Sequence, residues 1–440
     1  MSNINSRRLI GGGFGALVEW YDFLVYGLSA PAIAANFFPS SNRTAAMLST
    51  FAVFGVAFLA RPIGGALFGY LGDRYGRIRI LSWTVLAMGA STLLTGLLPT
   101  TQAIGIAAPA LLVVLRLVQG SCAGGETSGC LSYILECAPR DRRAVWTAVI
   151  GAFGFVPSAI AALIIFGLQA KMGGEDYIAY GWRIPFLVGG LLGGIGIWLR
   201  RNLSDPEEYS QAHAGKQENP ILSVASKKSL VNVILLVALQ ATGAYMMQGY
   251  MYSYLLQVVK ISVGAALLTN AATLTLLAVL LPVCGHFADR YGRKPVLFAG
   301  AIWFLITTYP AFLVASTGTV AGAFLGQTLL AIGVAVYAGA NFAVTVELFP
   351  TSMRQTGHAI AYNLSFALFG GFAPFVSTLL VAETGSSLSP TLLLMAVSLL
   401  AFITLFFTPE TKGIRLRDSV DSIESTSVSS LGKAANKFTR

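Results

Sequence analysis

Long apolar segments alternate with short polar loops along the whole chain. Each apolar segment approaches or exceeds the roughly 20 residues that a helix needs to cross the hydrocarbon core of a bilayer. The sequence therefore predicts an all-α membrane protein, because a helix satisfies its backbone hydrogen bonds internally in lipid. Twelve transmembrane helices are predicted, at about 10–36, 46–72, 79–99, 104–135, 144–170, 182–201, 229–257, 265–288, 295–316, 318–348, 354–382 and 388–408.

The longest polar stretch between helices separates the sixth from the seventh. It divides the chain into an N-terminal half of six helices (1–201), a cytoplasmic linker (202–228) and a C-terminal half of six helices (229–408). A polar, serine-rich segment (409–440) follows as a cytoplasmic tail that is expected to be disordered.

Two charged motifs recur at equivalent places in the two halves. Gly-Asp-Arg-Tyr-Gly-Arg at 72–77 returns as Ala-Asp-Arg-Tyr-Gly-Arg at 288–293, an offset of 216 (289 − 73). The spacing Glu-x-x-Pro-x-x-x-Arg at 136–143 returns at 347–354, an offset of 211 (347 − 136). The halves are therefore expected to form two pseudo-symmetric bundles, and parallel repeats of this kind place a substrate site between them near the bilayer midplane.

Composition agrees with lipid as the solvent. Of 440 residues, 55% are hydrophobic and 11% charged, with a mean hydropathy of +0.70, whereas soluble domains carry roughly 25% charged residues. The net charge of +10 is spread over loops, which indicates topology rather than nucleic-acid binding. It predicts a multi-pass membrane protein with both termini in the cytoplasm, and we expect the membrane to be a bacterial cytoplasmic (inner) membrane. The cysteines and histidines lack metal-ligand spacing, and no catalytic motif indicates an enzyme.

The repeated loop resembles the signature of the major facilitator superfamily, between helices 2 and 3 and again between helices 8 and 9. Within that superfamily the chain resembles the metabolite:proton symporter family. The segments that carry this resemblance are Glu19-Trp-Tyr-Asp22-Phe-Leu-Val-Tyr26-Gly27, Arg61-Pro62-Ile-Gly-Gly, Arg116-Leu-Val-Gln119-Gly120 with Gly125-Glu126, Gly181-Trp182-Arg183-Ile-Pro185-Phe, Glu347-Leu-Phe-Pro350, and Tyr362-Asn363 with Gly371. The resemblance implies the major facilitator fold and transport by alternating access. It implies import of tricarboxylates, α-ketoglutarate, shikimate, or proline and betaine, each with a proton.

The resemblance also implies that the charged loops gate the transport path, because charge pairs there hold one conformation and break in another. The alternative is that these charges only determine topology. The candidate gating residues are Gly69, Asp73, Arg74, Gly76, Arg77, Gly285, Asp289, Arg290, Gly292, Arg293, Glu136, Arg143, Glu347 and Arg354.

Glu19 and Asp22 lie three residues apart in the first helix, with Tyr26 four residues further on the same face. Intramembrane carboxylates are costly and usually face a cavity. We expect them to take part in proton coupling or in the binding cavity. The alternatives are a packed pair with a cation and a side chain that reaches the membrane interface.

Arg116 lies inside the fourth helix, and Gln119 and Glu126 follow close to the same face. A guanidinium can hold a carboxylate by two parallel hydrogen bonds. A nearby acid that takes up a proton would free Arg116 to bind an anionic substrate. The alternative is a permanent ion pair that ties the first and fourth helices together.

The second half carries fewer charges within its predicted helices, so the residues that bind the coupled proton are expected in the first half. Its candidate binding residues are neutral and polar: Tyr245, Gln248, Asn341 and Asn363.

We therefore expect a secondary active transporter that imports a small organic acid (a mono-, di- or tricarboxylate) by proton symport. It needs no cofactor besides the coupling proton, and a monomer is the default expectation. The apolar stretch 151–157 in the fifth helix argues against a polyanionic tricarboxylate. The alternative is a symporter of a zwitterionic osmolyte such as proline or betaine, although no heptad repeat supports osmosensing in the tail. A membrane sensor that has lost transport is a further alternative.

Overall fold

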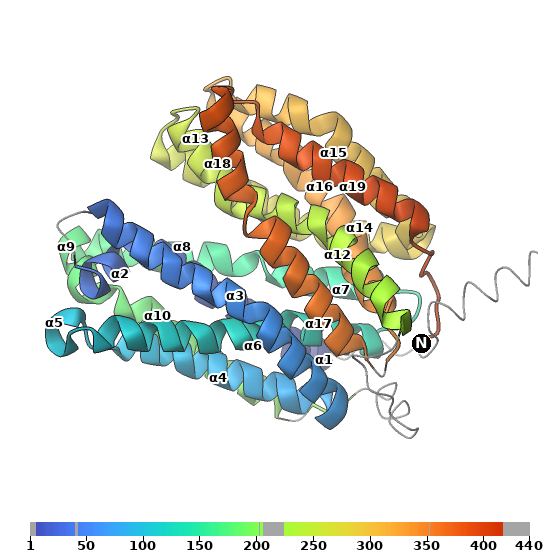
Figure 1. Cartoon of the computed structure of the whole chain (residues 1–440), viewed down its shortest axis with the longest axis horizontal. Helices are drawn as coiled ribbons and strands as arrows, with labels where there is room; N and C mark the ends of the chain where they lie inside the picture. Colours follow the sequence, from blue (N-terminus) through green and yellow to red (C-terminus); the bar gives the residue numbers. More distant parts are fainter. Residues whose placement is uncertain (1–5, 40–42, 202, 206–223, 352, 417–440) are drawn as a thin grey trace, which may run out of the picture. The chain divides into compact units, whose positions relative to one another are not determined.

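The chain forms helices joined by short turns (Figure 1). The structure is a computed structural model, and it describes residues 6–39, 43–201, 203–205, 224–351 and 353–416. Ten helical spans in this part are long and apolar enough to cross a membrane. The linker residues 206–223 and the tail residues 417–440 lie outside the described residues.

The first half is built of helices connected by turns and one π-helical segment. In chain order they are α1 (Ser6–Leu28), α2 (Ala30–Phe37), α3 (Arg43–Tyr75), α4 (Arg77–Leu97), α5 (Thr101–Ile104), α6 (Ala107–Cys137), α7 (Arg143–Phe153), α8 (Val156–Met172), α9 (Gly174–Asp176), η1 (Tyr177–Gly181) and α10 (Arg183–Arg200).

The second half repeats this plan with two further π-helical segments inside its spans. Its elements are α12 (Val224–Tyr245), η2 (Met246–Tyr250), α13 (Met251–Gln257), α14 (Val263–Tyr291), α15 (Arg293–Ala315), α16 (Val320–Glu347), α17 (Arg354–Ser365), η3 (Phe366–Gly370), α18 (Ala373–Thr384) and α19 (Pro390–Phe407).

Each of the twelve predicted segments is helical, which confirms the all-α membrane fold class. The ten apolar spans cover ten of them. The other two are α1, which carries Glu19 and Asp22 at its middle, and the pair α7 and α8. A turn at Gly154 and Phe155 separates that pair, so the predicted fifth helix is two shorter helices rather than one. Prolines inside α3, α14 and α15 are tolerated because neighbouring helices can satisfy the freed backbone groups.

The chain separates into two compact units. The N-unit comprises Asn3–Ile134 and Val149–Asp205, and the C-unit comprises Leu135–Ala148 and the chain from Pro206 onward. The break between residues 205 and 206 falls within the predicted linker. The end of α6 and the start of α7, however, belong to the C-unit and not to the predicted N-terminal half. Two predicted polar segments also contain order: α12 begins at Val224, inside the predicted linker, and residues 409–416 of the predicted disordered tail make hydrogen bonds.

Close packing of α4 against α10 depends on glycine. A Cβ on Gly193 would lie 2.7 Å from the Cα of Gly89, and a Cβ on Gly89 would lie 2.8 Å from the Cα of Gly193. Two backbones can approach this closely only where neither residue has a side chain, which is the usual solution for helix pairs in lipid.

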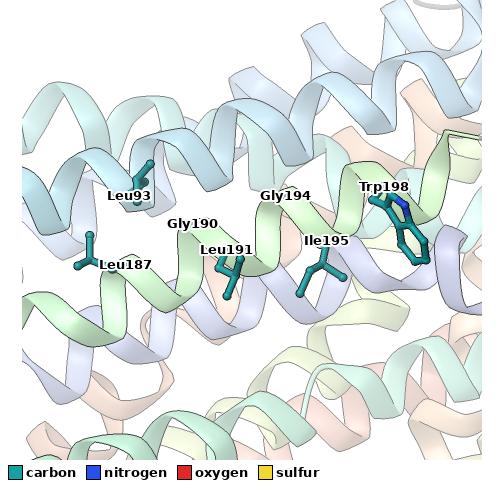
Figure 2. Close-up of a pocket in the computed structure, with 7 residues that line it drawn as sticks. All are labelled: Leu93, Leu187, Gly190, Leu191, Gly194, Ile195 and Trp198. Carbon is teal, nitrogen blue, oxygen red and sulfur yellow. The ribbon is translucent and has the colours of Figure 1, made fainter.

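The same two helices also form an exposed apolar surface. Gly190 and Gly194 of α10 line a shallow apolar groove with Trp198, and Figure 2 shows the groove's branched side chains beside them. The remaining lining residues are Leu93, Leu187, Leu191 and Ile195. Trp198 is 66% exposed, which identifies this face as one that the bilayer covers.

This difference between neighbouring glycines gives a prediction. Gly193→Ala should lower the free energy of unfolding by about 1–3 kcal/mol, because the added methyl group overpacks the contact between α4 and α10. Gly194→Ala is the matched control: nothing lies within 4 Å of its Cβ position, so its melting temperature should equal or exceed the wild-type value. Thermal unfolding of the detergent-purified variants measures the difference, and equal melting temperatures would contradict the packing assignment.

Candidate functional site

The interior of the N-unit holds three ion pairs, each between a carboxylate and an arginine. They are Glu19 with Arg61, Asp22 with Arg116, and Glu126 with Arg200. All six side chains are at least 96% buried. Since an unpaired charge in a membrane bundle is very costly, the pairing explains how the sequence tolerates these residues among apolar helices.

Asp22 of α1 is the centre of a hydrogen-bonded group that joins three helices. Its Oδ2 accepts from Arg116 Nη1 of α6 at 3.2 Å. Its Oδ1 accepts from Thr92 Oγ1 of α4 at 2.7 Å and from Gln119 Nε2 at 2.8 Å. Gln119 in turn accepts from Arg116 Nη1 at 2.9 Å, so the two α6 residues are fixed relative to each other. The structure thus brings together Asp22, Arg116 and Gln119. The pair of Asp22 with Arg116 is an ion pair between the first and fourth predicted helices, which the sequence analysis gave as the alternative to a symport unit.

An aromatic wall surrounds the Arg116 guanidinium. Its central carbon lies 4.3 Å from the ring centroid of Tyr26, 5.1 Å from that of Phe23 and 5.6 Å from that of Phe54. Tyr26 is anchored through its hydroxyl, which donates to the carbonyl of Thr50 at 3.1 Å. Cation–π attraction can therefore stabilise positive charge at this place in addition to Asp22.

Arg116 is only partly satisfied. Among the described residues, its Nε and Nη2 atoms have no hydrogen-bond partner although both are buried. These two atoms form one edge of the planar guanidinium, which is the edge that binds a carboxylate by two parallel hydrogen bonds. A buried donor pair without an acceptor is costly in lipid and is expected where a ligand binds.

Glu19 lies one helical turn before Asp22 but belongs to a separate pair. Its Oε1 accepts from Arg61 Nη2 of α3 at 2.6 Å, and its Oε2 accepts from Thr127 Oγ1 of α6 at 2.6 Å. Arg61 also lies against the rings of Phe23 and Phe58. Glu19 therefore stays a candidate for proton coupling beside the Arg116 group.

Glu126 does not join Arg116, and this corrects the prediction that the two residues form one symport unit. Ten residues of helix separate them by about 15 Å along the axis. Glu126 instead accepts from Arg200 Nη2 at 2.5 Å and from Thr84 Oγ1 at 2.5 Å, and Cys130 Sγ lies 3.2 Å away. Arg200 also donates to the carbonyls of Gly11 and Leu81.

The neutral candidates of the C-unit have separate surroundings. Asn341 Nδ2 of α16 donates to Gln240 Oε1 of α12 at 2.7 Å, while Asn341 Oδ1 is buried without a partner among the described residues. Tyr245 packs edge-on against Phe366 at 6.0 Å between ring centroids. Asn363 donates to the carbonyl of its own helix at Ala359.

Gln248 lies half-buried in the π-helical segment η2. Substrate binding by Tyr245, Gln248, Asn341 and Asn363 stays a prediction.

The two repeated loops have the same local geometry. Asp73 pairs with Arg77, and Asp289 pairs with Arg293 at 3.1 Å, each four residues apart. The glycine between them, Gly76 or Gly292, has φ +108°, which an L side chain rarely adopts.

A carboxylate caps the helix that follows each loop. Asp205 accepts from the backbone N–H of Ile78 at 2.9 Å. Glu410 accepts from the backbone N–H groups of Arg293 and Lys294, each at 3.0 Å. A negative group at a helix N-terminus is favourable. A Cβ on Gly76 would lie 2.4 Å from Asp205 Oδ2, so the glycine also leaves room for the cap.

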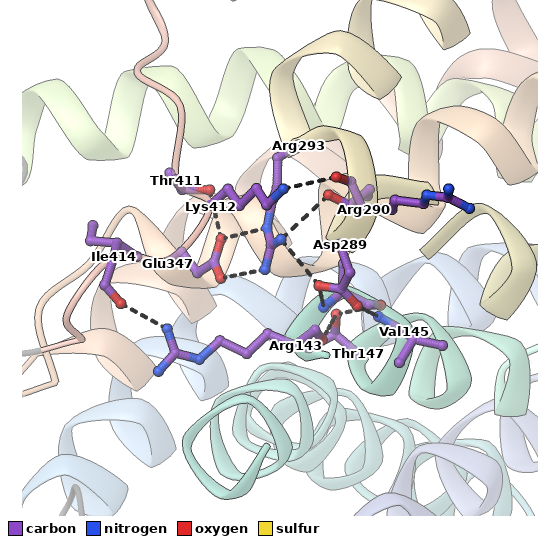
Figure 3. Close-up of polar contacts among 12 residues, drawn as sticks. Arg143, Val145, Thr147, Asp289, Arg290, Arg293, Glu347, Thr411, Lys412 and Ile414 are labelled. Carbon is purple, nitrogen blue, oxygen red and sulfur yellow. Dashed lines mark hydrogen bonds and ion pairs between the residues drawn. The ribbon is translucent and has the colours of Figure 1, made fainter. Parts of the chain in front are cut away.

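The loop-end cluster of the C-unit consists of ion pairs and caps around Asp289 and Glu347 (Figure 3). Asp289 accepts from the backbone N–H groups of Ala144 and Val145 at 3.0 and 2.9 Å, and so caps the start of α7. Glu347 accepts from Arg293 Nη2 at 3.2 Å.

The other repeated glutamate of the cluster, Glu136, accepts from Arg354 Nη1 at 2.8 Å. Glu136 and Glu347 of the repeated motifs therefore form ion pairs with Arg354 and Arg293. Arg143 instead donates to a backbone carbonyl. A gating role for these residues stays a prediction.

The remaining gating candidates have simpler surroundings. Gly285 lets α14 approach α7, since a Cβ there would lie 2.7 Å from the carbonyl oxygen of Ala144. Arg74 and Arg290 lie against tyrosine rings near the ends of their helices. Gly69 is buried in α3, and Arg143 is described with the strap below.

Sequence reasoning missed several members of the buried groups. Arg200 was not identified because it ends a helix, where an arginine usually marks topology. Thr84, Thr92 and Thr127 were not identified because a threonine in an apolar segment carries no distinguishing signal. If every buried charged side chain is required to have a partner, Glu126 needs a cation from another helix, and this requirement would have indicated a residue such as Arg200.

Comparison with known proteins decides the family. The model of the Major Facilitator Superfamily matches residues 13–280 and 234–435. The chain belongs to the major facilitator superfamily. It is 33% identical over 431 residues to the ectoine/proline transporter ProP of Corynebacterium glutamicum, covering 94% of this chain and 86% of that protein. It is 33% identical over 414 residues to the proline/betaine transporter of Salmonella typhimurium, covering 90% and 82%.

Solved structures of the superfamily show the same fold. The proton:xylose symporter XylE, bound to 6-bromo-6-deoxy-D-glucose, superposes with a TM-score of 0.78 at 18% identity, covering 93% of this chain and 97% of that one. A bacterial homologue of the iron transporter ferroportin gives a TM-score of 0.64 at 14% identity, covering 92% and 99%. The major facilitator fold and the resemblance to metabolite:proton symporters are confirmed, and the chain is a multi-pass membrane transporter.

Arg200 makes more hydrogen bonds than Arg116, and this difference gives a prediction. Arg200→Gln should lower the free energy of unfolding by about 3–5 kcal/mol, because it leaves Glu126 buried without its cation. Arg116→Gln should cost less, because within the described residues Arg116 donates through Nη1 alone and Asp22 keeps its hydrogen bonds from Thr92 and Gln119. The double variant Glu126→Gln/Arg200→Gln should recover part of the loss. Thermal unfolding in detergent measures all three, and a larger loss for Arg116→Gln than for Arg200→Gln would contradict the assignment.

Proposed function

We propose that the chain is a proton symporter of a small zwitterion of the proline and betaine class. The comparisons favour this alternative over the organic acid that the sequence analysis placed first, since the relatives at 33% identity are named for proline, betaine and ectoine. Carboxylate transport is not supported by them. The observation that carries the proposal is the buried Nε and Nη2 edge of Arg116, which no described residue accepts from, in a group that the Asp22 pair makes neutral.

Charge balance favours a zwitterion over an anion. The buried carboxylates of the described N-unit are Glu19, Asp22, Asp73 and Glu126, and its buried arginines are Arg61, Arg77, Arg116 and Arg200. Four of each sign leave no surplus cation. A dicarboxylate or tricarboxylate would bring uncompensated negative charge into a low-dielectric interior, whereas a zwitterion adds none.

The geometry of the Arg116 group suits both ends of such a ligand. The carboxylate of the ligand would accept from Nε and Nη2 of Arg116 without displacing Asp22 from Nη1. The ammonium group would be stabilised by the faces of Tyr26 and Phe54, since aromatic rings are the usual partners of quaternary ammonium groups.

Proton coupling follows from the shared arginine. A ligand carboxylate on Arg116 competes electrostatically with Asp22 for the same positive charge. Asp22 can then take up a proton, and the loaded site carries both substrate and proton. Glu126 is less suited to this role, because Arg200, Thr84 and Cys130 already surround its carboxylate.

We also propose that the protein lies in a bacterial inner membrane with both termini in the cytoplasm. The concentration of arginine and lysine in the loops assigned to one side supports this orientation.

The substrate-binding role of Arg116 is tested by its removal. Arg116→Gln should weaken uptake of radiolabelled proline or glycine betaine into proteoliposomes by roughly 100-fold, because two charge-assisted hydrogen bonds are lost. Arg79→Gln is the control, since Arg79 is an exposed arginine of the same unit outside the group. Wild-type uptake by a folded Arg116→Gln protein would contradict the proposal.

The coupling role of Asp22 is tested separately. Asp22→Asn should still exchange internal for external substrate, but an imposed proton gradient should no longer drive accumulation. Exchange and accumulation are compared in the same proteoliposome preparation. Accumulation at the wild-type level in Asp22→Asn would assign the proton to another group, with Glu19→Gln as the next variant.

A further inference from the structure

The segment that follows α19 stays in contact with the C-unit. Residues 408–416, named the strap here, run along the loop-end cluster of the C-unit and bond to it at several points. Thr411 Oγ1 donates to Glu347 Oε2 at 2.6 Å, and Lys412 Nζ donates to the carbonyl of Arg290 at 2.8 Å. Thr411 is 1% exposed, so this part of the strap is an integral part of the cluster.

The end of the strap is held most firmly. The carbonyl of Leu416 accepts three hydrogen bonds: from the N–H of Thr351 at 3.1 Å, from Thr351 Oγ1 at 2.9 Å and from Arg354 Nη2 at 2.6 Å. Leu416 is 3% exposed. The strap therefore reaches from the start of α15, through Glu410, to the start of α17.

The strap also breaks the symmetry of the repeated motifs. The motif Glu136…Arg143 repeats as Glu347…Arg354, and Arg354 pairs with Glu136. The symmetric partner of that pair would be Arg143 with Glu347. Among the described residues, however, no carboxylate lies within ion-pair distance of Arg143. Its Nη1 donates to the carbonyl of Ile414 at 2.9 Å (Figure 3), and its Nε is buried without a partner.

Glu347 is the acceptor that Arg143 lacks. Its carboxylate acts electrostatically on the Arg143 guanidinium. Its Oε2 is occupied by Thr411, which belongs to the same strap that occupies Arg143. Arg293 also donates to both oxygens of Glu347, so Arg293 and the strap together satisfy this carboxylate. One segment thus contacts both partners of the missing ion pair, and each of its hydrogen bonds is weaker than the pair would be.

We propose that the strap is a lock on the loop-end cluster, which keeps Arg143 and Glu347 apart until it is released. On release, Arg143 exchanges the Ile414 carbonyl for the Glu347 carboxylate and completes the second of the two symmetric pairs. The consequence for transport, which rests on the proposed function, is a faster conformational cycle when the strap is free. The affinity for substrate does not change, because none of the bonds that hold the strap involves a residue of the Arg116 group.

Gly413 allows the strap to be released by a substitution that removes none of the side chains that hold it. Gly413 has φ +77°, and nothing lies within 4 Å of its Cβ position. Gly413→Val should open the strap, because a β-branched residue is strained at positive φ. Gly413→Asn is the matched control, since asparagine tolerates this conformation. Thr411→Val and its control Thr411→Ser form a second pair, which removes or keeps the hydroxyl that bonds to Glu347.

The first measurement is hydrogen exchange at the amide of Thr351, which donates to Leu416. Gly413→Val and Thr411→Val should exchange at this amide roughly tenfold faster or more than the Asn and Ser controls. The second measurement is a double-mutant cycle, in which the change in melting temperature is compared between Arg143→Gln, Glu347→Gln and the double variant. The two effects should be additive in the Gly413→Asn protein and clearly non-additive in the Gly413→Val protein.

The third measurement is the initial uptake rate in proteoliposomes, which should rise severalfold in the releasing variants at unchanged KM. Equal exchange at Thr351 in all variants, or additivity in both backgrounds, would overturn the lock. Faster exchange and non-additivity without any uptake by wild-type protein would leave the lock standing and contradict the proposed function instead. An unchanged uptake rate in variants whose strap is open would overturn the link between the strap and transport.

Discussion

A buried arginine in a membrane bundle requires a carboxylate, and the N-unit provides one for each of its four. This constraint places α1, α3, α4, α6 and α10 around three interior ion pairs, because the partners come from different helices. The pairs differ in how completely they are satisfied. Glu126 and Arg200 bond to each other and to further groups, while the Nε and Nη2 edge of Arg116 has no acceptor among the described residues. The same requirement for neutrality therefore produces both a structural contact and a site that can bind a ligand.

Much of the fold could be predicted from the sequence, because lipid permits few solutions. Segment length determined the helices, and the repeated loops determined the duplication. The break at Gly154 and the ordered residues 409–416 could not be predicted, since apolar composition is the same in a straight and a broken helix. Order in a polar segment depends on partners distant in the sequence, as for Leu416 with Thr351 and Arg354.

The site could be predicted only in part, because the spacing of residues along one helix does not show which residues of other helices they contact. Arg116 and Gln119 were grouped because helical spacing places them on one face, and Asp22 was a candidate because it is a carboxylate inside a membrane helix. Glu126 was assigned to the wrong partner, because spacing along one helix does not show which other helix supplies the cation. Arg200 lies 74 residues away in the chain. The substrate class was also placed in the wrong order, since a guanidinium alone indicates an anion, whereas the observed pairing with Asp22 leaves a neutral site.

The central claim is that a neutral site around Arg116 selects a zwitterion. Glycine betaine and 3,3-dimethylbutanoate have nearly the same shape and the same carboxylate, and they differ in a quaternary nitrogen that replaces a carbon. Binding of both to the purified protein can be compared by isothermal titration calorimetry. The account predicts that betaine binds and that 3,3-dimethylbutanoate binds at least tenfold more weakly or not at all. Tighter binding of 3,3-dimethylbutanoate would contradict it and would restore the organic acid as the substrate.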